Sequence, residues 1–154
     1  EKIKYYRGSL NNVAKRLYDT AMYEKQSFFL RISGDSPLLD FRLINKSINI
    51  FEKNKNFDLI TNIFPRTFPS GQSVEIIRTN TLGKNIKFFS RQDKEHVTRY
   101  FYRNSSKFRI KNFVNKKKTS IKKLSIDTID DLKKILKHFK KKKFLNYSYL
   151  NEKN

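Results

Sequence analysis

The sequence contains no cysteine and no tryptophan, and only two histidines, three prolines and four glycines. Without thiols the chain can form neither a disulfide bond nor a thiolate metal site, and two histidines are too few for an ordinary zinc centre. Any bound metal ion must therefore be held by oxygen ligands. So few glycines also leave no glycine-rich loop of the kind that cradles phosphates.

Long apolar runs are also missing. No run approaches the roughly 20 residues that a membrane-spanning helix needs. The start, EKIKYYRGS, has neither the apolar core nor the cleavage site of a signal peptide. We therefore expect a cytoplasmic protein without a membrane partner. Because the chain begins at Glu1 and its only methionine is Met22, we also expect it to be a piece of a longer protein.

The composition is that of one folded domain with a large positive charge. A chain of 154 residues with 37% hydrophobic content can bury one substantial core. We expect one domain over residues 1–143 and a basic, polar tail over 144–154. The net charge of +21 favours a polyanionic partner. However, the lysines are scattered over termini and turns without a recognised nucleic-acid motif, which disfavours nucleic acid.

Apolar periodicity predicts an alternation of strands and helices in the first part of the chain. We predict strands over residues 3–7, 28–33 and 57–62, with a helix capped by Ser9 after the first and a helix capped by Asp40 after the second. Such alternation predicts an α/β fold with a mainly parallel sheet and helices on both faces. In these sheets ligands bind beyond the carboxyl ends of the strands, where Asp35 and Asn62 fall.

The rest of the chain is less regular. We predict strands over residues 73–79, 108–114 and 121–127, and a helix over 93–104 capped by Asp93. A last helix is predicted after Thr128, because Asp130 and Asp131 in its first turn oppose the helix dipole. Residues 63–72 are predicted to form a loop.

Two aspartates, Asp35 and Asp127, each come just past the end of a predicted apolar strand. Mg²⁺ is usually held by one or two carboxylates together with phosphate oxygens and water. The pair therefore suggests one magnesium site. A turn or helix-capping role is the alternative for each.

Four motifs occur in a fixed order, namely RISGDSPLLD, FPSGQSVEI, EHVTRYFYRN and LSIDTIDDL, and RGSLNNVAKRLYDTA precedes them. Together they resemble the cytidylyltransferases, in particular the spore-coat-polysaccharide branch related to the CMP-N-acetylneuraminate and CMP-KDO synthetases. The resemblance spans Arg7 to Leu132. It implies a Rossmann-like fold of the nucleotide-diphospho-sugar-transferase type, and a homodimer.

The resemblance also implies an activity. The enzyme would transfer CMP from CTP to a sugar or sugar acid, with release of pyrophosphate, for surface polysaccharide biosynthesis. Asp35 and Asp127 would be catalytic and would hold Mg²⁺. The family's initial strand and its loop of arginine, glycine and lysine, which holds the triphosphate, do not occur here. We therefore expect an N-terminally truncated domain of a nucleotidyltransferase, and whether it is active without that segment is left open by the sequence.

Substrate contacts follow from the same resemblance. Gly71 would permit close approach of the sugar, Gln72 and Glu75 would bind its hydroxyls, and Glu95 and His96 would contact sugar or nucleotide. Further candidates lie near Asp35 and at the end of the next strand: Arg31, Ser33 and Asn62. Each residue also has an alternative role. Gly71 would be an ordinary loop glycine, and Glu75 an exposed strand glutamate. Glu95 would stabilise its own helix, and His96 would be a partly buried imidazole. Tyr100 to Tyr102 are predicted to be core or subunit contacts.

Two other functions remain open at this point. The chain is either an incomplete family member that has lost catalysis or a basic nucleic-acid-binding module. The second would show a steep loss of affinity with salt, because counterions are released on binding.

Overall fold

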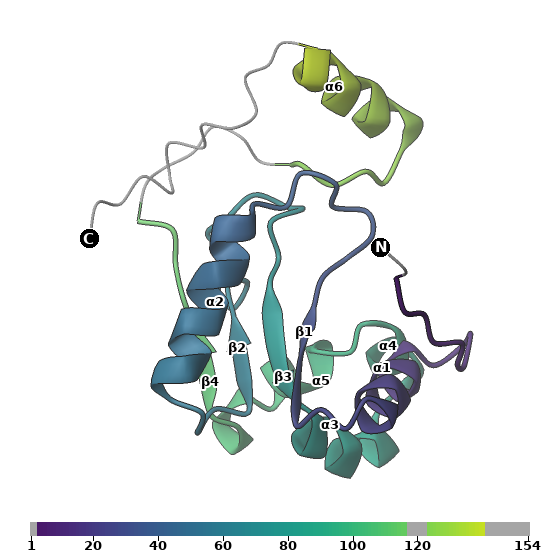
Figure 1. Cartoon of the computed structure of the whole chain (residues 1–154), viewed down its shortest axis with the longest axis vertical. Coiled ribbons are helices and arrows are strands. Elements are labelled where there is room, and N and C mark those ends of the chain that lie inside the picture. The colour runs from purple at the N-terminus through teal and green to yellow at the C-terminus, as the bar shows by residue number, and fades with distance from the viewer. Residues whose placement is uncertain (1–2, 117–122, 141–154) are drawn as a thin grey trace.

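The computed structural model describes residues 3–116 and 123–140, the last three of these through their backbone only. A four-stranded sheet with the order β1-β3-β2-β4 lies at its centre (Figure 1). The strands are β1 (Phe28–Arg31), β2 (Leu59–Thr61), β3 (Glu75–Arg78) and β4 (Ile110–Asn112). β3 is antiparallel to both of its neighbours, and β2 is parallel to β4. Three strands therefore share one direction and β3 opposes them.

The α/β class is confirmed, but the sheet is mixed. β1 and β2 are joined through the helix α2 (Phe41–Lys53), as the alternation predicts, whereas no helix separates β2 from β3. An antiparallel neighbour needs no helical crossover, so β3 can return directly beside β2. The pattern along the chain predicts the elements but not the position of β3 between β1 and β2.

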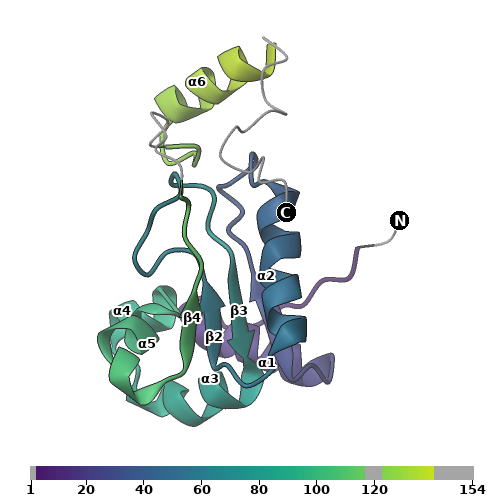
Figure 2. The same ribbon diagram turned by 90° about the vertical axis from the view of Figure 1, so that its left-hand side faces the viewer.

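Helices cover both faces of the sheet. Neighbouring residues in a strand point to opposite faces, so the apolar strands need a cover on each side. On one face, Ile60 and Ile76 pack with Leu43 of α2 in one buried cluster. On the other face, Leu59 and Ile77 pack with residues of α1 (Val13–Tyr23), α3 (Thr79–Asn85) and α5 (Arg99–Arg103). Figure 2 shows α2 on one side of the sheet and α5 on the other. The prediction of helices on both faces is therefore confirmed.

Several boundaries differ from the prediction. Residues 3–7 form no strand, and α1 is capped by Asn12, whose side chain accepts a hydrogen bond from the Lys15 N–H at 2.9 Å. Instead of one helix over 93–104 there are two short ones, α4 (Arg91–Glu95) and α5, because the backbone of His96 between them is not helical. Ser90 caps α4, and Asp93 is its capping-box partner.

Two short 3₁₀ turns complete this part of the chain, η1 (Ile86–Phe88) and η2 (Ser105–Lys107). The last described element is α6 (Ile129–Lys140). Its predicted cap is confirmed, because the Thr128 hydroxyl accepts a hydrogen bond from the Asp131 N–H at 3.2 Å. The strand predicted over 121–127 begins outside the described residues, and its described part makes only an isolated bridge between Ser70 and Lys123. None of the helices described here has the length and apolar character needed to cross a membrane.

Gly71 generates a test of this fold. Its φ is +86°, and a Cβ atom there would lie 2.5 Å from the backbone carbonyl carbon of Leu124. We expect Gly71→Ala to lower the free energy of unfolding by at least about 2 kcal/mol, because left-handed strain and a backbone clash add together. The measurement is the urea midpoint followed by circular dichroism.

Gly34→Ala is the matched control, because a Cβ atom on Gly34 would meet nothing within 4 Å. We expect this change to stay within about 0.5 kcal/mol of the parent. Equal urea midpoints for the two variants would contradict the described contact between residues 71 and 124.

Candidate functional site

Most of the predicted site residues lie at one edge of the sheet. The carboxyl ends of β1, β2 and β4 meet at this edge, which is at the top of Figure 1. Arg31 ends β1, and Glu75 begins the antiparallel β3 directly opposite Arg31. The segment that contains Asp127 joins this edge, because the Ile126 N–H donates a hydrogen bond to the Asp35 carbonyl at 2.8 Å. Residues far apart in the sequence thus meet where an α/β sheet binds its ligands.

Glu75 is the polar centre of this edge. Its side chain is 1% exposed, so the alternative of an exposed strand glutamate is wrong. Strand pairing places Arg31 and Thr61 on either side of it. The Arg31 guanidinium donates to one carboxylate oxygen at 2.5 Å, and the Tyr102 hydroxyl donates to the other. A buried carboxylate needs such partners, and here they come from β1 and α5.

Tyr102 is held as a hydrogen-bond donor. Burial raises the pKa of its phenol well above the ordinary value, and the negative charge of Glu75 raises that pKa further. The hydroxyl therefore stays protonated near neutral pH and lies 2.9 Å from the Thr61 hydroxyl. The Tyr102 ring stacks on the ring of Phe64, with centroids 4.7 Å apart and planes inclined by 15°.

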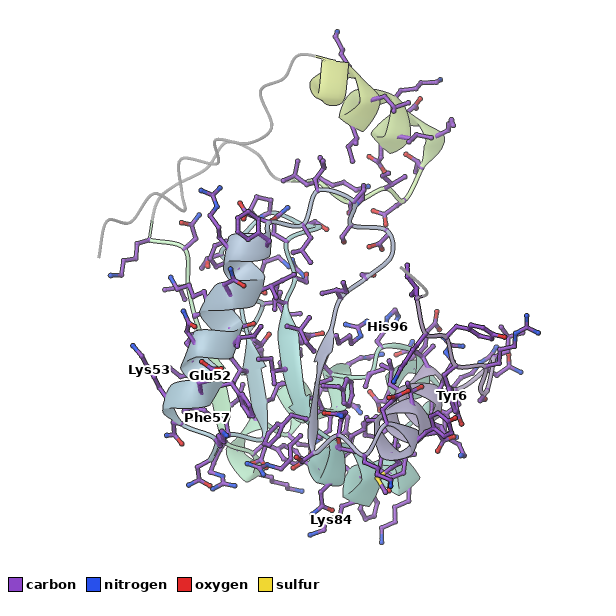
Figure 3. The ribbon with its side chains drawn as sticks, in the orientation of Figure 1. Tyr6, Glu52, Lys53, Phe57, Lys84 and His96 are labelled. Atoms are coloured by element: carbon purple, nitrogen blue, oxygen red, sulfur yellow. The ribbon has the colours of Figure 1, made fainter. Side chains whose placement is uncertain are left out.

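A pocket of about 430 Å³ opens beside these groups. Its size is within the range of small-molecule sites. Figure 3 labels His96, one of its lining residues, beside β1. The walls come from β1, from the loop after β2 and from the α4–α5 region: Arg31, Ile63, Phe64, His96, Thr98, Arg99, Tyr102 and Arg103. Arginine and aromatic side chains thus dominate its lining.

Arg31 and His96 were predicted as substrate contacts, but the other six lining residues were not: Ile63, Phe64, Thr98, Arg99, Tyr102 and Arg103. The prediction of core contacts is confirmed, because Phe101 is buried and Tyr100 and Tyr102 pack against the same cluster, although Tyr102 also lines the pocket. The spacing of Arg99 and Arg103, one helical turn apart, was the available signal, because residues four apart share a helix face.

Gln72 and Asn62 hold the loop between β2 and β3. Gln72 is fully buried; its side-chain oxygen accepts from the Asp40 N–H at 3.0 Å, and its nitrogen donates to the Leu38 carbonyl at 2.7 Å. Asn62 donates to the Gln72 carbonyl at 2.6 Å and accepts from the Val74 N–H at 2.9 Å. Each amide is thus bonded within the protein, and substrate binding by either stays a prediction.

The close approach at Gly71 is made by the chain itself, through the backbone of Leu124. Ser33 lies beyond β1, and its carbonyl accepts from the Ser36 N–H in a turn at 3.2 Å. Glu95 is exposed and lines a separate hollow of about 630 Å³, together with Arg91 and Lys94. The structure therefore does not bring Glu95 and His96 into one pocket. Sugar contacts by Gly71, Ser33 and Glu95 stay predictions.

Asp35 and Asp127 are both exposed at the edge. The Ser36 hydroxyl donates to Asp35 at 2.8 Å, and Lys123 lies 2.7 Å from Asp127 and 2.6 Å from Asp131. Within the described ranges there is no group of three or more His, Cys, Asp or Glu side chains that could hold a metal ion. Two carboxylates nevertheless fit the donor set of Mg²⁺, which completes its shell with phosphate oxygens and water.

Comparison with known proteins gives one consistent family. A family model described as cytidylyltransferase matches residues 2–153. A cytidylyltransferase structure from Leptospira borgpetersenii superposes with a TM-score of 0.78 and 26% sequence identity, over 97% of this chain and 69% of that one. The uncharacterized protein MJ1063 of Methanocaldococcus jannaschii is 32% identical over 145 residues. That match covers 89% of this chain and 57% of the relative, so the chain spans little more than half of the relative's length.

The pair of Arg31 and Glu75 generates a second test. Arg31→Met leaves the buried carboxylate without its cation, and we expect a loss of about 3–5 kcal/mol of folding free energy. Adding Glu75→Gln to this variant removes the unpaired charge and should recover part of the loss. A double-mutant cycle by urea unfolding should give a coupling energy of about 0.5–3 kcal/mol.

Lys133→Met is the control, since it breaks the ion pair between Lys133 and Asp130. The side chains of these two residues are 70% and 74% exposed. We expect this variant to unfold like the parent. Additive effects of Arg31→Met and Glu75→Gln, with no coupling, would contradict the described pair.

Proposed function

The chain belongs to the cytidylyltransferase family, and from this premise we propose that it transfers CMP from CTP to a sugar or sugar acid with release of pyrophosphate. The motifs of the spore-coat branch support a role in surface polysaccharide biosynthesis. The observation that carries the proposal is the edge itself, where the hydrogen bond from the Ile126 N–H to the Asp35 carbonyl brings together the segments of two exposed aspartates. At the same edge Arg31, the last residue of the strand that leads to Asp35, lines a pocket of about 430 Å³.

The reaction is an in-line displacement at phosphorus. A hydroxyl of the acceptor loses its proton and its oxygen forms a bond to the α-phosphorus of CTP, while the bond from that phosphorus to the bridging oxygen breaks and pyrophosphate leaves. Asp35 and Asp127 would hold Mg²⁺, which when bound supplies neutralisation of phosphate charge. For this, Asp127 has to exchange its ion pair with Lys123 for the metal.

The pocket suits the acceptor. The Phe64 ring, which stacks on Tyr102 and lines the pocket, offers an apolar surface to a sugar ring. Arg31 and Tyr102 are fixed by Glu75, so the floor of the pocket does not have to order when substrate binds. Such preorganised contacts lower the entropy that binding would otherwise cost.

Asparagine variants of the two aspartates test this proposal. We expect Asp35→Asn and Asp127→Asn each to weaken Mn²⁺ binding, measured by water-proton relaxation, by about tenfold or more, because loss of a supporting contact alone has that effect. Pyrophosphate release from CTP, assayed with a panel of sugars and sugar acids, should fall in parallel. Asp130→Asn is the control, since it makes the same charge change in the first turn of α6, where Asp130 pairs only with Lys133 among the described residues.

Each outcome has one meaning. Unchanged Mn²⁺ binding in Asp35→Asn and Asp127→Asn would remove the two aspartates from the metal site. Failure of the parent chain to bind CTP with Mg²⁺ would overturn the transferase proposal. Steeply salt-dependent retention by DNA in that case would favour the basic binding module instead.

A further inference from the structure

Lys123 lies between two carboxylates at the edge of the sheet. Its ammonium nitrogen is 2.7 Å from an Asp127 oxygen and 2.6 Å from an Asp131 oxygen. An ammonium group has three N–H donors, so it can bond both carboxylates at once. Asp127 is one of the two aspartates proposed to hold Mg²⁺. The lysine therefore contacts a carboxylate that the metal would use.

Asp131 is the more firmly held of the two carboxylates. The oxygen that contacts Lys123 also accepts from the Asp127 N–H at 3.1 Å, and from the N–H and the hydroxyl of Thr128, each at 3.0 Å. The Asp131 side chain is 12% exposed, whereas that of Asp127 is 55% exposed. These bonds fix Asp131 in the first turn of α6, which lies beyond the sheet edge in Figure 1. Asp131 is thus a permanent partner for the ammonium, and Asp127 is an exchangeable one.

Asp127 has a second support that involves no cation. The Ser125 hydroxyl donates to the same Asp127 oxygen at 3.3 Å and lies 3.1 Å from the Ser70 hydroxyl. The Leu124 N–H donates to the Ser70 carbonyl at 2.7 Å, which ties this segment to the loop between β2 and β3. These bonds do not depend on Lys123. The Asp127 carboxylate is therefore kept at the edge when the ammonium leaves it.

The pair between Lys123 and Asp127 is also weak enough to exchange. The two side chains are 42% and 55% exposed. Loss of an exposed ion pair changes an equilibrium by at most about fivefold. A divalent cation can therefore displace the ammonium from Asp127, but at a cost in affinity. The positive charge that stays on Asp131 lowers the affinity further, because like charges repel.

We propose that Lys123 is a positioning residue of the metal site, which neutralises Asp127 until Mg²⁺ binds and then stays on Asp131. It thereby raises the Mg²⁺ concentration at which the site fills. This inference rests on the proposed function of Asp35 and Asp127 as metal ligands. It gives Lys123 a role that requires no contact with nucleotide or acceptor.

Two variants of Lys123 test the proposal through Mn²⁺ binding, measured by water-proton relaxation. We expect Lys123→Met to bind Mn²⁺ about threefold to tenfold more tightly than the parent, because it removes both the competing pair and a positive charge. Lys123→Arg keeps the charge and matches carboxylates with its fork, so it should bind Mn²⁺ no more tightly than the parent. A lysine that only supports the fold would give the opposite result, with weaker binding in Lys123→Met.

Lys134→Met is the matched control, because Lys134 lines the same hollow of about 220 Å³ as Lys123 and Asp131. It removes an equal charge from this hollow, and within the described ranges Lys134 makes no ion pair with Asp127. We expect its Mn²⁺ affinity to stay within about twofold of the parent. Equal tightening in Lys123→Met and Lys134→Met, weaker binding in Lys123→Met, or a parent chain that binds no Mn²⁺ would each overturn the role of Lys123.

The titration uses neither CTP nor acceptor, so it separates this inference from the proposed transfer reaction. Tighter Mn²⁺ binding in Lys123→Met, in a chain that releases no pyrophosphate from CTP, would keep the role of Lys123 and overturn the transferase. Pyrophosphate release by a chain whose Mn²⁺ affinity is unchanged in Lys123→Met would do the reverse.

Discussion

A single buried carboxylate organises the site of this protein. Glu75 is the first residue of the central antiparallel strand, and it is enclosed almost completely. A charge in such a place is tolerated only when cations and donors surround it. Arg31 and Tyr102 meet this need, and the same two residues line the pocket. The requirement to satisfy Glu75 therefore also fixes the shape and polarity of the proposed binding site.

The loop between β2 and β3 is the second constraint at this edge. The Asn62 side chain forms a hydrogen bond within this loop, and the Gln72 side chain forms one with the backbone just before α2. Gly71 lets the backbone of Leu124 approach the loop closely. That approach brings the segment of residues 123–128 to the turn at Asp35. Residues that sequence reasoning assigned to substrate thus make the internal contacts that bring the two aspartates to one edge.

Local signals in the sequence predicted local features well. Asp40 and Thr128 cap their helices as expected, because a cap depends on residues only two or three positions away. Asp35 and Asn62 were predicted beyond the carboxyl ends of two strands and follow β1 and β2 there, because strand ends can be read from apolar runs. His96 lines the pocket, and its predicted contact with sugar or nucleotide stays a prediction.

Other features depend on contacts between distant residues, which a single sequence does not display. The insertion of β3 between β1 and β2 is one example, because it pairs residue 30 with residue 76. Tyr102 is another, since only the packing of α5 on the sheet turns its hydroxyl toward Glu75. The left-handed backbone of Gly71 is visible only once Leu124 is in place.

Strand register places Arg31, Glu75 and Thr61 in one row across three strands, and this row links the pocket to the folding of the whole domain. These residues are far apart in the chain, so their row exists only once non-local strand pairing has formed, and such pairing slows folding because long loops must close first. The side of the pocket that Arg31 forms therefore comes apart only when the sheet itself unfolds. The wall from α5 is tied to the same sheet, because the buried Phe101 packs with Leu59 and Ile77, and the Tyr102 hydroxyl donates to Glu75. Opening of α5 would leave the buried Glu75 carboxylate without one of its described donors, so this wall and the sheet are held closed by the same contacts.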